Sequence, residues 1–284
     1  MRAGRFDAAW ALSDAVLAAR DPASRDDPAL PYHLRWVWDG TPPDGRDVVV
    51  RCYHGLGDTV QFSRYLPALR ARCARLVVEA QPALLGLLAR LPGASGWTLH
   101  PFDPARPLPP GACDIEIMEL GHVLRRVPPP LAPRLPAAPA RDGMAKTGGR
   151  RVGLCWRAGG WDPARSVPLA WMLARPELRG AIPVSLQRGP AAAEADGRFA
   201  NPGDDDRDVL ATAALIASCD AVLSVDTLVA HLAATLGAAT TVVLQARADW
   251  RWMRGGRTAW YPRARLLRRE GAAGPWSEAG GPGV

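Results

Sequence analysis

Apolar and polar positions follow two different periods along the chain. Residues 4–20 place Phe6, Trp10 and Leu17 at helical spacing, which predicts an amphipathic helix. From residue 47 onward, short continuous runs of Val, Ile and Leu alternate with stretches of helical spacing. Buried strands separated by helices are typical of a parallel sheet that is covered on both faces. The pattern therefore predicts an α/β fold.

The alternation of strands and helices occurs twice, on either side of a Pro-rich segment at Pro128–Pro139. Strands are predicted in the first array at residues 47–53, 76–80, 96–100 and 114–118, and in the second at 151–156, 182–186, 221–225 and 240–244. Helices are predicted at 59–73, 83–91, 169–173, 206–218 and 227–236, with a kink or a break at Pro67.

Two arrays predict two Rossmann-like parallel-sheet domains, residues 46–140 and 148–284, behind a helical extension at residues 1–45. Ligands of open α/β sheets bind outside the carboxyl ends of the strands. With two such sheets, we expect a ligand in the cleft between the domains.

The charge changes this picture only modestly. The net charge is +7, and nearly all of the positive charge is Arg. This favours anionic ligands, but no stretch interleaves aromatic and basic residues as single-strand-binding surfaces do. We therefore expect no nucleic-acid partner; binding that weakens steeply with salt would be the sign of one.

The five cysteines are far apart and form no CxxC pair, so neither a zinc site nor another metal site is expected. Asp7 and Asp14 interrupt the first apolar stretch, which argues against a signal peptide. No uncharged run approaches the ~20 residues needed to span a bilayer. A cytoplasmic protein with at most peripheral membrane contact is the expectation.

The first candidate site is the segment Gly55-Leu56-Gly57-Asp58-Thr59, directly after a predicted strand and at the start of a helix. Gly55 and Gly57 allow a tight turn and the close approach of a ligand. Asp58 has two interpretations: a carboxylate that works on a ligand, or a helix cap. The spacing does not fit GxGxxG, which disfavours a dinucleotide oxidoreductase.

The second candidate runs from Ser224 to His231, from the end of a strand into a helix of small residues. The N–H groups and the dipole at a helix start bind anions, so Ser224, Thr227 and His231 are predicted to converge on one oxyanion or phosphate. The alternative is that Asp226 or Thr227 caps the helix and that His231 is a half-buried histidine with ordinary partners.

Two further segments carry candidate ligand contacts. Arg157 and Arg165 lie in the Gly-rich loop after the strand at 151–156, and Arg forks suit phosphates; the alternative is that they are solvated. Trp250, in Asp249-Trp250-Arg251-Trp252, either stacks on a base or sugar or packs the end of the domain. Residues 204–206 are all Asp and are interpreted as a helix start.

Taken together, these motifs resemble glycosyltransferase family 9, the ADP-heptose:lipopolysaccharide heptosyltransferase-like proteins. The closest likeness is to the branch found at the C-terminal end of bacterial tetratricopeptide-repeat proteins, with residues 4–20 similar to a last repeat helix. The resemblance covers about residues 34–270, and its carriers are the segments 51–67, 165–169, 224–231, 249–252 and 260–262.

The resemblance implies a GT-B fold and an inverting, metal-independent transfer of a sugar from a nucleoside-diphosphate donor to a glycan, lipid-linked or protein acceptor. It needs no cofactor. Asp58 matches the proposed general base. Donor contacts are implied at Gly55, Gly57, Arg157, Arg165, Ser224, Asp226, Thr227, His231 and Trp250.

The sequence departs from the family at one point. Heptosyltransferases use a lysine in the loop after the first C-terminal strand, where this chain offers only arginines. The tail after Glu270 also shows no clear helical pattern. The alternative hypothesis is therefore a non-catalytic relative that binds a nucleotide or glycan, or acts as an interaction module.

Overall fold

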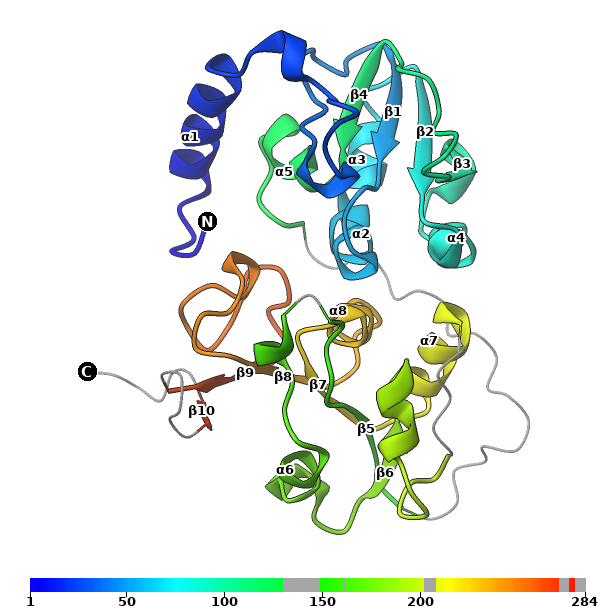
Figure 1. Cartoon of the computed structure of the whole chain (residues 1–284), viewed down its shortest axis with the longest axis vertical. Coiled ribbons are helices and arrows are strands. Elements are labelled where there is room, and N and C mark those ends of the chain that lie inside the picture. The colour runs from blue at the N-terminus through cyan, green and yellow to red at the C-terminus, as the bar shows by residue number, and fades with distance from the viewer. Residues whose placement is uncertain (130–148, 161, 202–207, 271–275, 279–284) are drawn as a thin grey trace. The chain divides into compact units, whose positions relative to one another are not determined.

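The computed structural model describes residues 1–129, 149–160, 162–201, 208–270 and 276–278. The chain divides into two compact units, residues 3–135 and 136–284 (Figure 1). The predicted junction at residues 140–148 and most of the Pro-rich segment lie outside the described residues. The helical extension belongs to the first unit rather than forming a unit of its own.

The first unit contains one parallel sheet of four strands in the order β3-β2-β1-β4. Each predicted strand of this array is confirmed, with its ends shifted by a few residues. The elements are α1 (Phe6–Ala18), β1 (Asp47–Arg51), α2 (Leu56–Phe62), α3 (Leu66–Arg70), β2 (Arg75–Ala80), α4 (Pro82–Leu88), β3 (Thr98–Pro101), β4 (Cys113–Glu116) and α5 (Leu120–Val123).

The helix predicted at 59–73 is divided in two, as the position of Pro67 predicts. Ser63–Tyr65 forms a 3₁₀ turn between α2 and α3, and Pro67 occupies the first turn of α3, where a missing N–H costs nothing. The first of these helices starts earlier than predicted, at Leu56. Gly57 and Asp58 therefore lie within its first turn.

The extension is fixed to the first unit by α1. Phe6 and Trp10 are buried, and Asp14 accepts hydrogen bonds from His122 and Arg125 at 2.8 and 2.5 Å. Figure 1 shows α1 beside α5, the helix that carries His122. Among the described residues, no helix combines the length and the apolar character that crossing a membrane requires.

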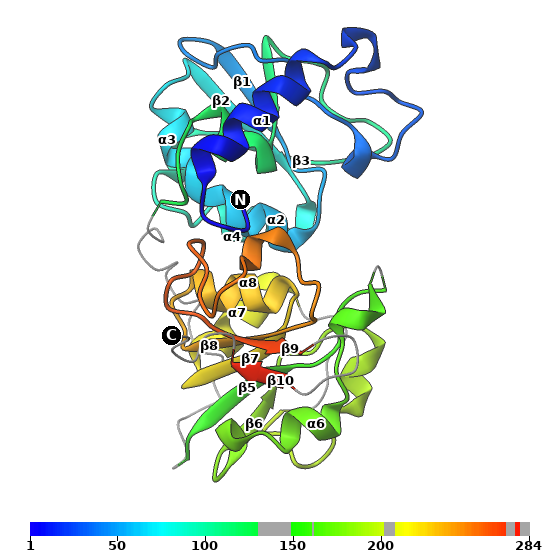
Figure 2. The same cartoon turned by 90° about the vertical axis from the view of Figure 1, so that its left-hand side faces the viewer.

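The second unit contains a six-stranded sheet in the order β10-β9-β8-β7-β5-β6, parallel except for β10. Figures 1 and 2 show α7 and α8 on one face of this sheet and α6 on the other. The elements are β5 (Arg151–Cys155), α6 (Leu169–Leu173), β6 (Ile182–Ser185), α7 (Val209–Ala217), β7 (Ala221–Val225), α8 (Leu228–Thr235), β8 (Thr240–Leu244), β9 (Arg265–Arg269) and β10 (Trp276–Glu278).

The strand pair β9–β10 was not predicted from the sequence. Leu266 and Leu267 of β9 are buried, but three arginines surround them and hide the apolar run. The helix predicted at 206–218 begins at Val209 with Asp208 as its cap, because the Asp208 carboxylate accepts from Ala211 N at 2.6 Å. The prediction for residues 204–206 lies outside the described part of the chain.

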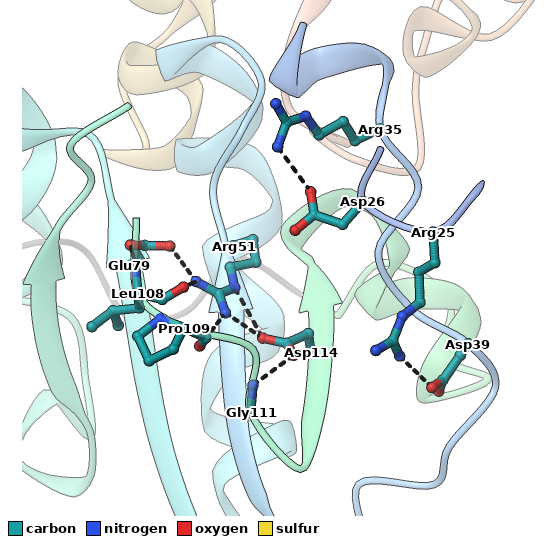
Figure 3. Close-up of polar contacts among 10 residues, drawn as sticks. All are labelled: Arg25, Asp26, Arg35, Asp39, Arg51, Glu79, Leu108, Pro109, Gly111 and Asp114. Carbon is teal, nitrogen blue, oxygen red and sulfur yellow. Dashed lines mark hydrogen bonds and ion pairs between the residues drawn. The ribbon is translucent and has the colours of Figure 1, made fainter. Parts of the chain in front are cut away.

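A buried arginine organises the first sheet (Figure 3). Arg51, at the end of β1, is 3 % exposed and contacts Glu79 at 2.7 Å and Asp114 at 2.6 Å. Its guanidinium also donates to the carbonyl oxygens of Leu108 and Pro109, both at 2.9 Å. Five hydrogen bonds thus use the five N–H donors of the side chain.

The carboxylates of Glu79 and Asp114 also hold the connection between β3 and β4, residues 102–112. Glu79 accepts from Leu108 N at 2.6 Å, and Asp114 accepts from Gly111 N at 2.8 Å. A Cβ at Gly111 would lie 3.0 Å from Val49, so glycine permits the close approach to β1. Burial opposes the charge of Arg51, but Glu79 and Asp114 outweigh it and hold the pKa of Arg51 above its ordinary value.

Replacing Arg51 by Met is expected to lower the free energy of unfolding by about 3–5 kcal/mol, because two buried carboxylates lose their cation. Urea unfolding measures this change. The matched control is Arg75→Met, since Arg75 pairs with Asp47 across the same two strands but is 70 % exposed. The control should be nearly neutral; equal effects in the two variants would show that the Arg51 network does not stabilise the fold.

Candidate active site

The carboxyl ends of β1, β2 and β4 bring together the polar residues of the first unit. His54 follows β1, Gln81 follows β2, and Glu116 ends β4. Gln81 donates to His54 O at 2.6 Å and accepts from the Thr59 hydroxyl at 3.0 Å. We call these residues, together with Asp58, the first-unit edge.

Asp58 lies in the first turn of α2, three residues after its cap Gly55. Its Oδ2 accepts a hydrogen bond from Gly55 N at 3.0 Å. A Cβ at Gly55 would lie 3.2 Å from this oxygen, so glycine lets the carboxylate fold back closely. Asp58 is therefore not the N-cap itself, and its side chain, which is half-buried, both closes the turn and remains accessible to solvent.

His54 and Glu116 form a pair that the sequence analysis did not single out. The Nδ1 atom of His54 lies 2.9 Å from Glu116 Oε1, with the imidazole 27 % exposed and the carboxylate 4 % exposed. The β1–β4 register places Glu116 opposite Arg51, only three residues before His54. Sixty-two residues separate the two partners in sequence, so no local pattern links them.

Glu119 lies beside this pair. Its Oε2 accepts from the backbone N–H groups of Glu116 and Trp38 at 3.1 and 3.3 Å, and Arg20 lies 4.0 Å from Oε1. Burial, followed by the charge of Glu116, raises the pKa of Glu119 to about 7. The first-unit edge thus holds three carboxyl groups and one imidazole.

In the second unit, the polar residues gather where β5 and β7 end and α8 begins. Thr227 precedes the first helical residue, but its hydroxyl does not cap α8. The hydroxyl is turned back toward Ser224, at 3.3 Å, and donates to Val225 O, also at 3.3 Å. The interpretation of Thr227 as a side-chain cap is therefore wrong, and the dipole end of α8 keeps the character of an anion site.

Ser224 is fully buried, and its hydroxyl donates to Val225 O at 2.8 Å. The Ser224 side chain therefore lies in the interior, 3.3 Å from the Thr227 hydroxyl, and not at the surface where the sequence predicted a ligand contact. Cys155, at the end of β5, lies 3.6 Å from the Thr227 hydroxyl. Burial raises the pKa of this thiol to about 11, so it remains protonated and acts as packing.

His231 lies on α8 with partners at both ring nitrogens. Nδ1 lies 3.0 Å from the Tyr261 hydroxyl and Nε2 3.6 Å from Asp226 Oδ1, and the ring stacks on Trp252 at 5.1 Å. His231 is 6 % exposed. Burial opposes the charge of Asp226, but His231, Trp252 and Arg165 together outweigh it and lower the pKa of Asp226. These contacts fit the interpretation of His231 as a histidine with ordinary partners.

The loop after β5 is tied down at both ends. Gln187 accepts with Oε1 from Trp156 N at 3.0 Å and from Arg157 N at 2.9 Å. At the other end, Arg165 donates to the main-chain oxygen of Asp226 at 3.1 Å, which joins this loop to the start of α8. In between, a Cβ at Gly159 or Gly160 would meet nothing within 4 Å.

The predicted arginines and tryptophan occupy different surroundings. Arg157 is half exposed and pairs with Glu194 at 3.2 Å, whereas Arg165 contacts the start of α8. Trp250 begins a 3₁₀ turn and meets Trp260 edge to face at 5.8 Å. Arg251 lies over the Trp250 ring at 5.0 Å. Trp250 therefore has packing partners of its own, and a ligand contact there stays a prediction.

Within the described ranges, no three His, Cys, Asp or Glu side chains are placed so that they could hold one metal ion together. We call the start of α8, together with Thr227, Asp226 and Arg165, the second-unit edge. Each unit presents its polar residues at the carboxyl ends of its parallel strands, where ligands of open α/β sheets bind.

Comparison with solved structures shows that the chain shares its fold with proteins named as heptosyltransferases or glycosyltransferases. The chain is similar to E. coli ADP-heptose LPS heptosyltransferase II, with a TM-score of 0.58 and 14 % identity over 80 % of this chain and 92 % of that one. It is equally similar to a family 9 glycosyl transferase from Veillonella parvula, with a TM-score of 0.58 and 12 % identity over 80 % of this chain and 87 % of that one.

A third similar structure is the iron-containing dodecameric glycosyltransferase TibC of enterotoxigenic E. coli. The TM-score is 0.54 at 14 % identity, over 72 % of this chain and 59 % of TibC. No family profile and no curated protein sequence matches the chain. The fold is therefore the GT-B-like, heptosyltransferase-like α/β fold that the sequence predicted.

The raised pKa of Glu119 predicts a pH dependence of stability. Between about pH 4.5 and 7 the unfolded chain has released this proton while the folded chain retains it, so stability falls as the pH rises through that window. Glu119→Gln removes this contribution and can still accept the same backbone N–H groups. Denaturant unfolding at pH 8 should show the variant more stable than the wild type by up to roughly 3 kcal/mol.

At pH 5 the Glu119→Gln variant and the wild type should unfold at nearly the same denaturant concentration, because the carboxyl group is then neutral in the folded chain. A difference that stays constant from pH 5 to pH 8 would show that Glu119 does not titrate in this window.

Proposed function

We propose that this chain is an inverting, metal-independent glycosyltransferase that moves a sugar from a nucleoside-diphosphate donor to a hydroxyl acceptor. One observation carries the proposal: each of the two Rossmann-like units has a different half of the required chemistry at its strand-end edge. The first has an accessible carboxylate, Asp58, and the second has an anion-binding helix terminus. The fold shared with three glycosyltransferases supports it.

The donor diphosphate is assigned to the second-unit edge. The first-turn N–H groups of α8 bind its negative charge, and Arg165 adds a cation beside the same terminus. The charge on the diphosphate grows as the sugar leaves, so these fixed groups stabilise the transition state more than the ground state. Asp226 and His231 hold the start of α8 by their mutual contact.

The acceptor is assigned to the first-unit edge. Asp58 takes the proton of the acceptor hydroxyl as that oxygen attacks the anomeric carbon. The new bond to oxygen forms on one face of the sugar while the bond to the diphosphate breaks on the other, and the electron pair leaves with the diphosphate. A single displacement of this kind inverts the anomeric configuration.

ADP-heptose is the first donor to test, because one similar enzyme is named an ADP-heptose heptosyltransferase and TibC has been solved in complex with ADP-D-β-D-heptose. Heptosyltransferases use a lysine in the loop after β5, where this chain has arginines. Other nucleotides and sugars therefore belong in the same test. Candidate acceptors are a glycan, a lipid-linked saccharide or a protein hydroxyl.

A second candidate function is a non-catalytic module that binds a nucleotide or a glycan. The observation that favours it is the hydrogen bond from Gly55 N to Asp58, because that contact gives the carboxylate a structural role without chemistry.

Nucleotide binding is expected to depend on Arg165. Thermal-shift measurements with ADP, UDP, GDP and the corresponding nucleotide-sugars should identify a stabilising ligand. At a concentration of a hundred times its Kd, such a ligand raises the free energy of unfolding by about 2.7 kcal/mol. Arg165→Gln should weaken that ligand roughly tenfold, about 1.4 kcal/mol. Arg179→Gln, on an exposed residue of the same unit, is the control. Equal affinities in the two variants would remove Arg165 from the donor site.

Turnover is expected to depend on Asp58. Asp58→Asn keeps an oxygen that can accept from Gly55 N, so the turn should survive while the base is lost. Sugar transfer should fall by about 10²–10⁴-fold with nearly unchanged donor binding. Asp103→Asn, on an exposed loop, is the matched control. Full activity of Asp58→Asn would exclude the assignment of the base, and binding without turnover in the wild type would favour the non-catalytic module.

A further inference from the structure

The first-unit edge contains a second group that is built for proton transfer. The His54 imidazole is partly exposed, while the carboxylate that contacts its Nδ1 is buried. A buried carboxylate at one ring nitrogen fixes the ring orientation and places the proton of the neutral ring on that nitrogen. The lone pair of the neutral ring is then on Nε2, the atom that can accept a proton.

The carboxylate of Glu116 is itself held in place. Its Oε2 accepts from Met118 N at 2.7 Å, so only Oε1 is directed at His54. Glu116 N in turn donates to Glu119, which lies close to Arg20. His54 is thus linked through Glu116 to Glu119 and Arg20, with Cys52 close to Glu116 in the chain fold and Asp58 on the adjoining helix. An imidazolium formed at His54 is stabilised by the negative charge of Glu116.

His54 and Asp58 belong to one turn. The Asp58 carboxylate oxygen lies 3.0 Å from the amide nitrogen of Gly55, which is the atom bonded to the carbonyl carbon of His54. Gln81, which donates to His54 O, holds the backbone of the same turn. Two proton-accepting side chains therefore start from one fixed segment of backbone.

We propose that His54, oriented by Glu116, is a proton-relay residue that carries the acceptor's proton away from Asp58. The inference rests on the proposed function. The O–H bond of the acceptor breaks, and its proton passes to the Asp58 carboxylate and from there to Nε2 of His54. The partly exposed imidazolium then releases the proton to water, and both residues return to their starting forms. His54 acts through Asp58 and positions no sugar.

The test uses the full chain with the donor that thermal shift identifies and an acceptor that the wild type glycosylates. His54→Ala should lower kcat by about a hundredfold, with little change in the KM of either substrate. Added imidazole should restore roughly a tenth or more of the wild-type rate, because it replaces the missing base. Glu116→Gln should shift the pH profile of kcat. His33→Ala, an exposed histidine of the same unit, is the control.

A loss of activity that imidazole does not restore, or a change confined to KM, would overturn the relay. An active wild type with an unaffected His54→Ala variant would overturn the relay and leave the glycosyltransferase proposal standing, whereas an inactive wild type would count against both. The ring nitrogens give a readout without turnover. Nitrogen NMR of the wild type should show neutral His54 protonated at Nδ1, and Glu116→Gln should lose this preference; protonation at Nε2 in the wild type would also overturn the proposal.

Discussion

The buried guanidinium of Arg51 is the constraint on which the first unit depends. The Arg51 side chain joins β1 to both neighbouring strands and to the connection from β3 to β4. Its carbonyl contacts with Leu108 and Pro109 fix that connection, and its contact with Asp114 fixes β4 beside β1. A fully paired network holds its members in one arrangement. The Arg51 network therefore supports the β1–β4 register, in which Glu116 lies opposite Arg51 at the end of β1.

The two edges contain polar groups that respond differently to pH. The first relies on carboxyl groups and an imidazole, whose charges change with pH, and Glu119 titrates near neutrality. The second relies on a helix terminus and an arginine, whose charges are constant across the physiological range. The proposed sugar transfer needs both kinds of behaviour, because in it a proton moves while a diphosphate is held in place.

The strands and most helices were predictable because their apolar runs are continuous, as in Ala221–Val225 and Thr240–Leu244. The strand at 265–269 was not, because arginines interrupt its two buried leucines. In the candidate site, Asp58 and Thr227 were singled out because each lies at a strand–turn–helix boundary. The His54–Glu116 pair could not be, because it forms only when β4 is placed against β1. Likewise, the full burial of Ser224 depends on packing that no local pattern reveals.

The loop after β5 is fixed at both ends by hydrogen bonds, and its middle has room for larger side chains. Gln187 sets its departure from the sheet and Arg165 its return to α8, while Gly159 and Gly160 have open space around them. Side chains introduced at these two positions would enter open space without disturbing the contacts of Gln187 and Arg165 that fix the loop ends. Such a segment is a natural place for directed evolution, because its side chains can be varied independently of foldability.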